Sequence, residues 1–175
     1  MTAAVFPESS LQDVVAPDLK AIFCGLNPGR AAAAVGHHFE GRGNRFWPVL
    51  HQAGFTPRLL APPQDRELLR HGYGLTTLVS RATARADELS PAEYVAAADE
   101  LARKLARLRP RCIAFLGKAG YAAISGRKLV DWGPQSGHLA RASIWVLPNP
   151  SGLNRGFSLE ALVDAYRELR VALER

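Results

Sequence analysis

Four short, mostly apolar runs stand out along the chain and do not alternate with polar positions. They cover residues 21–26, 74–79, 112–117 and 143–147. Continuous apolar runs are typical of strands that are buried on both faces of a parallel sheet. The first run is followed by an Asn-Pro turn at Asn27 and Pro28, and the last by Asn149 and Pro150. Ligands of such sheets bind beyond the carboxyl ends of the strands, so both turns mark a candidate site.

Two segments between these runs have a helical period. Ser90-Pro91-Ala92-Glu93 is typical of a capping box with proline in the first turn, and apolar residues then recur every three or four positions up to Pro110. The second helix is expected after Ser158, a candidate N-cap, and its apolar stripe continues to Leu173. The alternation predicts an α/β three-layer sandwich, with helices flanking a central, mainly parallel sheet of four to five strands.

Length and composition indicate one globular domain. The 175 residues fit a single domain over 1–175, with an irregular N-terminal segment at 1–17, and 47% of the residues are hydrophobic. The first ten residues lack the basic start and apolar stretch of a secretion signal, so secretion is not expected. The two isolated cysteines favour a reducing cytoplasm, and the short chain fits a protein of the bacterial nucleoid. No apolar run approaches the ~20 residues of a membrane span, and no membrane association is expected.

The metal-binding residue types lack ligand spacing. Cys24 and Cys112 sit alone inside apolar runs, which argues against an iron–sulfur cluster, a structural zinc ion or a disulfide. His37 and His38 are adjacent but have no acidic or cysteine partner at ligand spacing. We therefore expect neither a metal nor a cofactor.

The charge favours a polyanionic partner. The formal net charge is +6, and arginine provides 18 of the 22 cationic residues. Arginine binds phosphate well because its planar fork reaches two oxygens at once. Residues 101–128 contain no acidic residue and eight cationic ones: Arg103, Lys104, Arg107, Arg109, Arg111, Lys118, Arg127 and Lys128. If several of these touch phosphates, binding falls steeply with salt.

The two Asn-Pro turns carry a specific resemblance. They stand within Gly25-Leu26-Asn27-Pro28-Gly29 and Asn149-Pro150-Ser151-Gly152-Leu153-Asn154-Arg155, with Asn44-Arg45-Phe46-Trp47 and Leu116-Gly117-Lys118 between them. In these motifs, and over nearly its whole length, the chain resembles the mismatch-specific uracil-DNA glycosylases, relatives of thymine-DNA glycosylase. The resemblance implies a uracil-DNA glycosylase-like fold.

The same resemblance implies a reaction and partners. We expect an enzyme that flips uracil or a related damaged pyrimidine out of mismatched double-stranded DNA, chiefly at G·U pairs. It would hydrolyse the N-glycosidic bond and leave an abasic site for downstream repair enzymes. No lysine replaces Asn27, so a lyase step is not expected. We also expect a monomer, because no heptad pattern is present.

Removing a base from a duplex sets physical demands that the motifs can meet. The nucleotide must leave the stack, so a pocket must receive the base and a wedge must hold the gap open. Asn27 is the catalytic position that the resemblance implies: its amide can orient water but cannot act as a general base near neutral pH. From the residues alone, a turn-capping role before Pro28 is favoured instead.

The remaining site assignments also follow from the resemblance. Phe39 is the aromatic that stacks on the flipped pyrimidine; its alternative is an ordinary core residue. Asn149 stands where faster relatives have histidine, and it would hydrogen-bond the base with help from backbone N–H groups near Leu26 and Phe39. The substrate-binding residues are Gly25, Leu26, Phe39 and Asn149.

The second motif matches the wedge. Leu153 is the expected intercalating residue, and Arg155 could donate to the partner guanine or to a phosphate. The alternative is a plain helix-entry loop with an exposed leucine. Lys118 follows the third strand, where it could hold a phosphate. The DNA-binding residues are Ser151, Gly152, Leu153, Asn154, Arg155 and Lys118.

Two further positions, Thr77 and Asp87, bear on the chemistry of the expected site. Thr77 occupies a place where close relatives are expected to carry lysine, and a hydroxyl cannot replace that charge. Asp87 lies in the loop after the second strand, where it could activate water as a second catalytic residue. We favour the other interpretation of Asp87, a helix-terminal charge that stabilises through the helix dipole.

Other functions remain open from the sequence. A non-catalytic α/β domain that binds mismatched or abasic DNA would keep the basic residues and the wedge, while Asn27 only shaped a turn. A nucleotide-binding Rossmann-like protein is the third possibility. It is disfavoured because no G-x-G-x-x-G or Walker loop is present.

Overall fold

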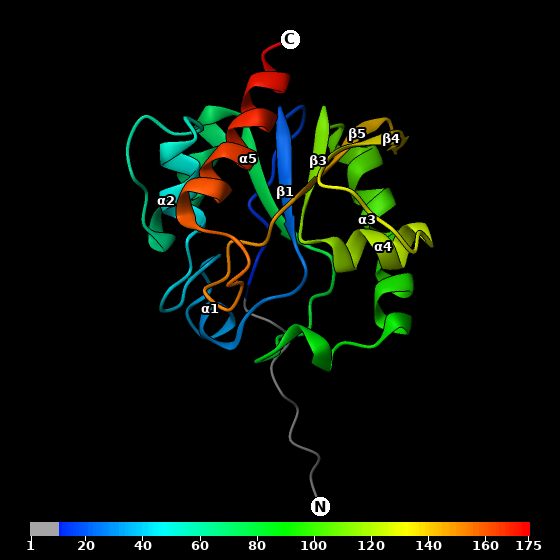
Figure 1. Cartoon of the computed structure of the whole chain (residues 1–175). Coiled ribbons are helices and arrows are strands. Elements are labelled where there is room, and N and C mark those ends of the chain that lie inside the picture. Colours follow the sequence, from blue (N-terminus) through cyan, green and yellow to red (C-terminus); the bar gives the residue numbers. More distant parts are fainter. Residues whose placement is uncertain (1–10) are drawn as a thin grey trace, which may run out of the picture.

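The computed structural model describes residues 11–175 and shows one central five-stranded sheet (Figure 1). The strand order is β2-β1-β3-β5-β4, and all neighbours run parallel except the antiparallel β4–β5 pair at one edge. The strands are β1 (Ala21–Gly25), β2 (Tyr73–Thr77), β3 (Cys112–Leu116), β4 (Gly133–Leu139) and β5 (Ala142–Leu147). The predicted α/β sandwich with a mainly parallel sheet is confirmed.

Helices cover both faces of the sheet and enclose two hydrophobic cores. Helices α2 (Phe46–Gln52) and α5 (Leu159–Leu173) pack on one face, and α3 (Pro91–Leu108) and α4 (Lys118–Ser125) on the other (Figure 1). Strand β1 contributes to both cores by strict alternation. Phe23 lies in the first core, whereas Ile22 and Cys24 lie in the second. This double burial explains why the strand is apolar throughout.

Both predicted helices form with the predicted caps. The Ser90 hydroxyl accepts a hydrogen bond from the Glu93 backbone N–H, and the Glu93 carboxylate accepts one from the Ser90 N–H, so the capping box is complete. The Ser158 hydroxyl accepts from Ala161 at the start of α5. Helix α5 then runs to the C-terminus, at the end of the molecule away from α1 (Arg30–Val35) (Figure 1).

Several elements were not predicted from the sequence. Strand β4 is polar and mostly exposed, and it is a strand because its backbone pairs with β5. Short helices α1, α2 and α4 and two 3-10 helices, η1 (Pro62–His71) and η2 (Ala86–Glu88), also lack a long apolar stripe.

Part of the expected irregular N-terminal segment, residues 1–10, lies outside the described residues. From residue 11 to 17, the chain makes one antiparallel bridge between Val14 and Leu75, and the Val14 side chain is buried. In the part of the chain that is described, no helix combines the length and apolarity needed to span a bilayer.

Candidate active site

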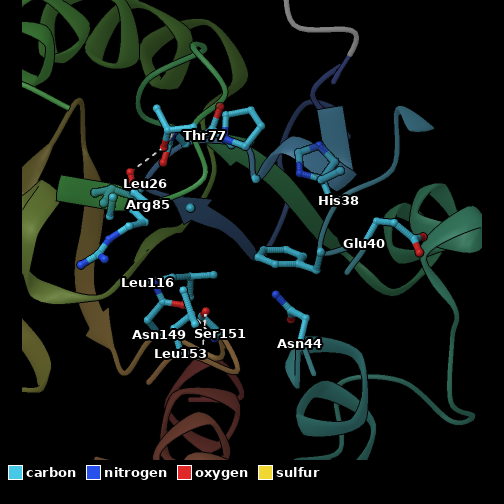
Figure 2. A pocket seen from close by; sticks show the side chains of 18 of the residues that line it. Leu26, His38, Glu40, Asn44, Thr77, Arg85, Leu116, Asn149, Ser151 and Leu153 are labelled. Carbon is cyan, nitrogen blue, oxygen red and sulfur yellow. Dashed lines mark hydrogen bonds between the residues drawn. The ribbon is translucent and has the colours of Figure 1, made fainter. Parts of the chain in front are cut away.

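A pocket of about 370 Å³ opens at the carboxyl-terminal edge of the sheet. Gly25 at the end of β1, Thr77 at the end of β2 and Leu116 at the end of β3 all line it, as does Asn149 just after β5. In Figure 2, Asn149, Ser151 and Leu153 lie on one side of the pocket, and Leu26, Thr77 and Arg85 on another. The two Asn-Pro turns therefore meet at one site, as parallel strand ends require.

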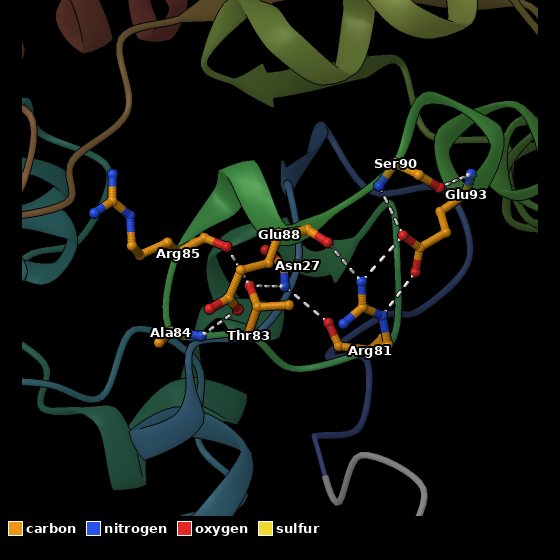
Figure 3. A network of polar contacts seen from close by, with 8 residues as sticks. All are labelled: Asn27, Arg81, Thr83, Ala84, Arg85, Glu88, Ser90 and Glu93. Atoms are coloured by element: carbon orange, nitrogen blue, oxygen red, sulfur yellow. Dashed lines mark hydrogen bonds and ion pairs between the residues drawn. The ribbon is translucent and has the colours of Figure 1, made fainter.

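The Asn27 side chain is held in one orientation. Its Nδ2 atom donates to the Arg81 carbonyl oxygen and to the Thr83 hydroxyl oxygen, both at 2.8 Å (Figure 3). A carbonyl oxygen can only accept, so the atom facing Arg81 must be the amide nitrogen. Both N–H groups are used, and Asn27 Oδ1 accepts no hydrogen bond from residues 11–175. The free end of this pocket-lining amide is an acceptor.

The loop of residues 81–85, which holds Asn27, is itself anchored to helix α3. The Arg81 guanidinium donates to both Glu93 carboxylate oxygens, at 2.7 and 3.1 Å, and to the Glu88 carbonyl. Its hydrogen bond holds the pKa of Glu93 at about 2, with help from the Ser90 N–H. The same loop is also joined to the Asn27–Pro28 turn through its backbone, because the Thr83 N–H donates to the Pro28 carbonyl at 3.2 Å.

Phe39 lies in the pocket wall in an unusual backbone conformation. Its φ is +58°, and its ring stacks on Phe46 with centroids 3.7 Å apart and an interplanar angle of 22°. The ring is only partly buried and lines the pocket. A non-glycine residue with positive φ is uncommon and concentrates at functional sites. This aromatic surface can stack on a planar ligand.

The two histidines before Phe39 are committed to internal contacts. His38 is buried, and its Nε2 atom lies 2.7 Å from the Gln12 carbonyl oxygen. Burial lowers the pKa of His38, which favours a neutral ring. His37 Nδ1 lies 3.4 Å from the Asp65 carboxylate, which also accepts from the His38 backbone. Over residues 11–175, no cluster of three or more His, Cys, Asp or Glu side chains is placed to hold a metal.

Asn149 presents a donor to the pocket. Its Oδ1 accepts from the Ser151 N–H at 2.9 Å, which leaves the Nδ2 group as the unpaired end within the described chain. Gly25 and Leu26 form the floor beside it. Their carbonyls accept from Leu78 and Val79, so the backbone is fixed there.

The loop of residues 149–157, called the 149–157 loop below, carries the predicted wedge. Leu153 lines the pocket mouth and is 78% exposed, and Arg155 is exposed. Gly152 passes against the backbone of Gly43. The Asn154 side chain is turned inward, donating to the Asn149 carbonyl and accepting from the Gly156 N–H. Leu153 and Arg155 are thus the outward-facing members of the predicted set.

Lys118 and Asp87 lie apart from the pocket-lining residues. Lys118 begins α4, and its ammonium lies 4.4 Å from the centre of the Trp132 ring, a cation–π contact. Asp87 is 66% exposed and pairs with Arg85 at 3.1 Å. The structure brings Arg85 but not Asp87 into the pocket wall, so catalysis by Asp87 would need the loop to move.

The cationic stretch at 101–128 does not form one free surface. Lys104 Nζ lies 2.6 Å from an Asp13 carboxylate oxygen and donates to Thr76, and Arg109 pairs with Asp18. Part of the charge therefore stabilises the fold rather than facing a ligand.

The comparisons with known proteins agree with this geometry. The profile described as the Uracil DNA glycosylase superfamily matches residues 12–170. The chain belongs to this superfamily. A candidate uracil DNA glycosylase from Methanosarcina acetivorans, solved by NMR in solution, has a similar fold. The TM-score is 0.56 at 19% identity, and the match covers 91% of this chain and 96% of that protein.

Sequence reasoning missed several groups around the candidate site. Arg81 and Thr83 position Asn27 from more than 50 residues away, and Arg45 hydrogen-bonds the 149–157 loop from a similarly remote segment. Arg45 was visible only as part of the Asn44–Trp47 motif, and no local pattern marks Arg81 or Thr83 as partners of Asn27.

Proposed function

We propose that this protein is a monofunctional, mismatch-specific DNA glycosylase that removes uracil, and related damaged pyrimidines, chiefly from G·U pairs. Superfamily membership supports hydrolysis of the base–sugar bond in DNA. The observation that carries the proposal is the fixed amide of the pocket-lining Asn27, whose Oδ1 acceptor has no hydrogen-bond partner among residues 11–175. An acceptor in this position can orient a water molecule through one of its O–H bonds.

The proposed reaction begins with the flipped base in the pocket. Phe39, backed by Phe46, stacks on the pyrimidine, and Asn149 Nδ2 donates to a base oxygen. The water held by Asn27 Oδ1 attacks C1′ of the deoxyribose. Its oxygen bonds to C1′ as the C1′–N1 bond breaks, and that electron pair leaves with the uracil anion. The surplus proton passes to solvent, and the base is protonated after release.

Three features suit slow, specific hydrolysis. Asn27 orients water without accepting its proton, so catalysis rests on positioning and on stabilising the leaving anion. Asn149 contributes one neutral donor, which stabilises the anion less than a charged group would. Thr77 contributes a neutral hydroxyl to the pocket wall, at a position where the resemblance leads us to expect lysine.

On this proposal, the 149–157 loop enters the duplex. Leu153 is the exposed apolar side chain that would fill the gap, and Arg155 beside it faces the partner strand or a phosphate. Lys118 would contact the DNA backbone from the start of α4. We further propose that the protein acts as a monomer in the bacterial cytoplasm, ahead of the enzymes that process abasic sites.

The decisive experiment uses an end-labelled duplex with one G·U pair, excess enzyme and alkali to cut abasic sites. The parent should cleave it, and Asn27→Ala should lose activity by about 100-fold or more while still binding the duplex. Gln135→Ala is the control for loss of a side-chain amide, because Gln135 lies on β4 and does not line the pocket. Parent enzyme that binds the duplex specifically but releases no uracil would favour a non-catalytic damage-binding domain.

A further inference from the structure

The Arg45 side chain hydrogen-bonds three carbonyl groups of the 149–157 loop. Arg45 Nη1 donates to the Phe157 oxygen at 2.7 Å, and Nη2 donates to the oxygens of Ser151 at 3.0 Å and Asn154 at 2.7 Å. The Arg45 backbone N–H donates to Pro150 at 3.0 Å. A planar guanidinium offers several donors in a rigid fork, so it fixes these carbonyls relative to one another.

Two further contacts fix the loop and the residue that precedes it. The Tyr166 hydroxyl, on α5, donates to the Pro148 carbonyl at 2.9 Å. Gly152 lies so close to Gly43 that an added Cβ would come within 2.8 Å of the Gly43 oxygen. The loop backbone is therefore tightly held, while the Leu153 side chain stands out into solvent.

Arg45 also belongs to the segment that forms the stacking wall. Asn44, which precedes it, lines the pocket, and Phe46, which follows it, lies under the Phe39 ring. The same short segment thus contacts the base side of the pocket and the loop that carries Leu153. The Arg45 Nε–H is buried and has no hydrogen-bond partner in residues 11–175, which is unfavourable for stability.

We propose that Arg45 is a positioning residue that preorganises the 149–157 loop for insertion into the duplex and couples it to the Phe39–Phe46 stack. This inference rests on the proposed glycosylase function. A loop already held in its bound shape loses less conformational entropy on binding, so more of the Leu153 contact energy remains as affinity. On this proposal Arg45 contacts no phosphate, because both Nη groups donate to carbonyls and the Nε–H is buried.

The first test is a double-mutant cycle on binding. The probe is a duplex with a tetrahydrofuran abasic analogue opposite guanine, and the variants are Arg45→Met, Leu153→Ala and the double variant. We expect each single substitution to weaken binding by about tenfold. The double variant should bind within about twofold of the weaker single variant, because both substitutions abolish the same function, the insertion of Leu153 into the duplex. Effects that simply multiply would overturn the proposal.

A matched control separates positioning from loss of charge. Arg170 also donates to a backbone carbonyl, that of Ala53 at 2.8 Å, but holds α5 rather than the 149–157 loop. Arg170→Met should leave abasic-duplex binding unchanged. The slope of log affinity against log salt should be the same for Arg45→Met and the parent. A slope reduced by about one would mean that Arg45 contacts a phosphate, which contradicts the proposal.

A second measurement does not depend on DNA or on Arg45→Met folding. In Arg45→Lys, a single nitrogen cannot take the positions of both Nη1 and Nη2, so at least one of the three carbonyl contacts is lost. Backbone amides at 151–157 should then exchange hydrogen at least about tenfold faster than in the parent. Strands β3 and β5 should be unaffected. Unchanged exchange in the loop overturns the proposal. Parent protein that neither releases uracil nor binds the abasic duplex would refute the proposed function, while the exchange result would still decide the structural claim.

Discussion

The Asn27 amide nitrogen and the Thr83 hydroxyl oxygen lie 2.8 Å apart, and this contact, together with the one to the Arg81 carbonyl, leaves Oδ1 as the free end of the amide within residues 11–175. The Thr83 hydroxyl donates its own proton to the Arg85 carbonyl at 2.8 Å, so its oxygen is left as an acceptor for Asn27. The Thr83 hydroxyl thereby helps to hold the proposed water-orienting group in one orientation (Figure 3).

Thr83→Val should slow uracil release without weakening DNA binding. The substitution removes one acceptor from Asn27, which frees the amide to rotate, and a net loss of ~1–1.4 kcal/mol corresponds to about a five- to tenfold lower single-turnover rate. Thr83→Ser keeps the hydroxyl and should stay within about twofold of the parent. A valine variant with parental rates would show that Arg81 alone is enough.

Leu153→Ala should weaken binding to a G·U duplex by about tenfold, because the exposed side chain no longer fills the gap left by the flipped base. Folding stability should be unchanged, since Leu153 is 78% exposed in the free protein. Leu59→Ala is the matched control: Leu59 is also exposed, at 55%, and does not line the pocket. Equal affinities for the parent and the Leu153 variant would count against a wedge.

Glu93→Gln should remove an acid-sensitive part of the stability. Arg81 holds the folded-state pKa of Glu93 at about 2, below its ordinary value of 4.5. The stabilisation is therefore complete above about pH 4.5 and is lost as the pH falls toward 2. Glutamine preserves the capping box, so the comparison isolates the charge. Urea unfolding from pH 7 to pH 3 should show the parent's advantage shrinking, whereas a constant difference would contradict this origin.

Asp87→Asn should leave the single-turnover rate within about twofold of the parent. The carboxylate is exposed, pairs with Arg85 and is absent from the pocket wall. A loss of tenfold or more, together with a changed pH–rate profile, would instead support the proposal that Asp87 activates water.

Lys118→Gln and Arg155→Gln should each reduce the slope of log affinity against log salt by about 0.9 if each contacts one phosphate. Discrimination between G·U and A·U duplexes should change only for Arg155→Gln, where a base contact is also proposed. Lys128→Gln, at an exposed cationic position, provides a comparison of charge alone. Unaltered slopes would mean that neither Lys118 nor Arg155 contacts a DNA phosphate.

The predicted parts of the fold are those that local chemistry determines. Strand β1 is apolar because both its faces are buried, and the Ser90 capping box satisfies N–H groups within four residues. Strand β4 could not be predicted from the polar sequence GPQSGHL, because its strand conformation depends on pairing with β5. Short helices such as α4 likewise gain their stability from packing.

The same distinction holds for the site. Asn27 and Asn149 could be placed at the ends of strands, because each one follows an apolar run and precedes a proline in the sequence. The partners that orient them did not, because Arg45 and the 149–157 loop are joined across more than 100 residues. Phe39 could be placed by resemblance, whereas its positive φ and its support by Phe46 required the structure.

The buried thiols of the sheet make this protein suitable for site-selective labelling. Burial raises the pKa of Cys24 to about 12 and that of Cys112 to about 11, so both stay protonated and shielded from maleimide reagents at neutral pH. A cysteine introduced at Val171, in the last turns of α5, would be the reactive thiol. A dye there would sit roughly 20 Å along the helix from the 149–157 loop, and a fluorescence transfer partner on the DNA could follow loop insertion molecule by molecule.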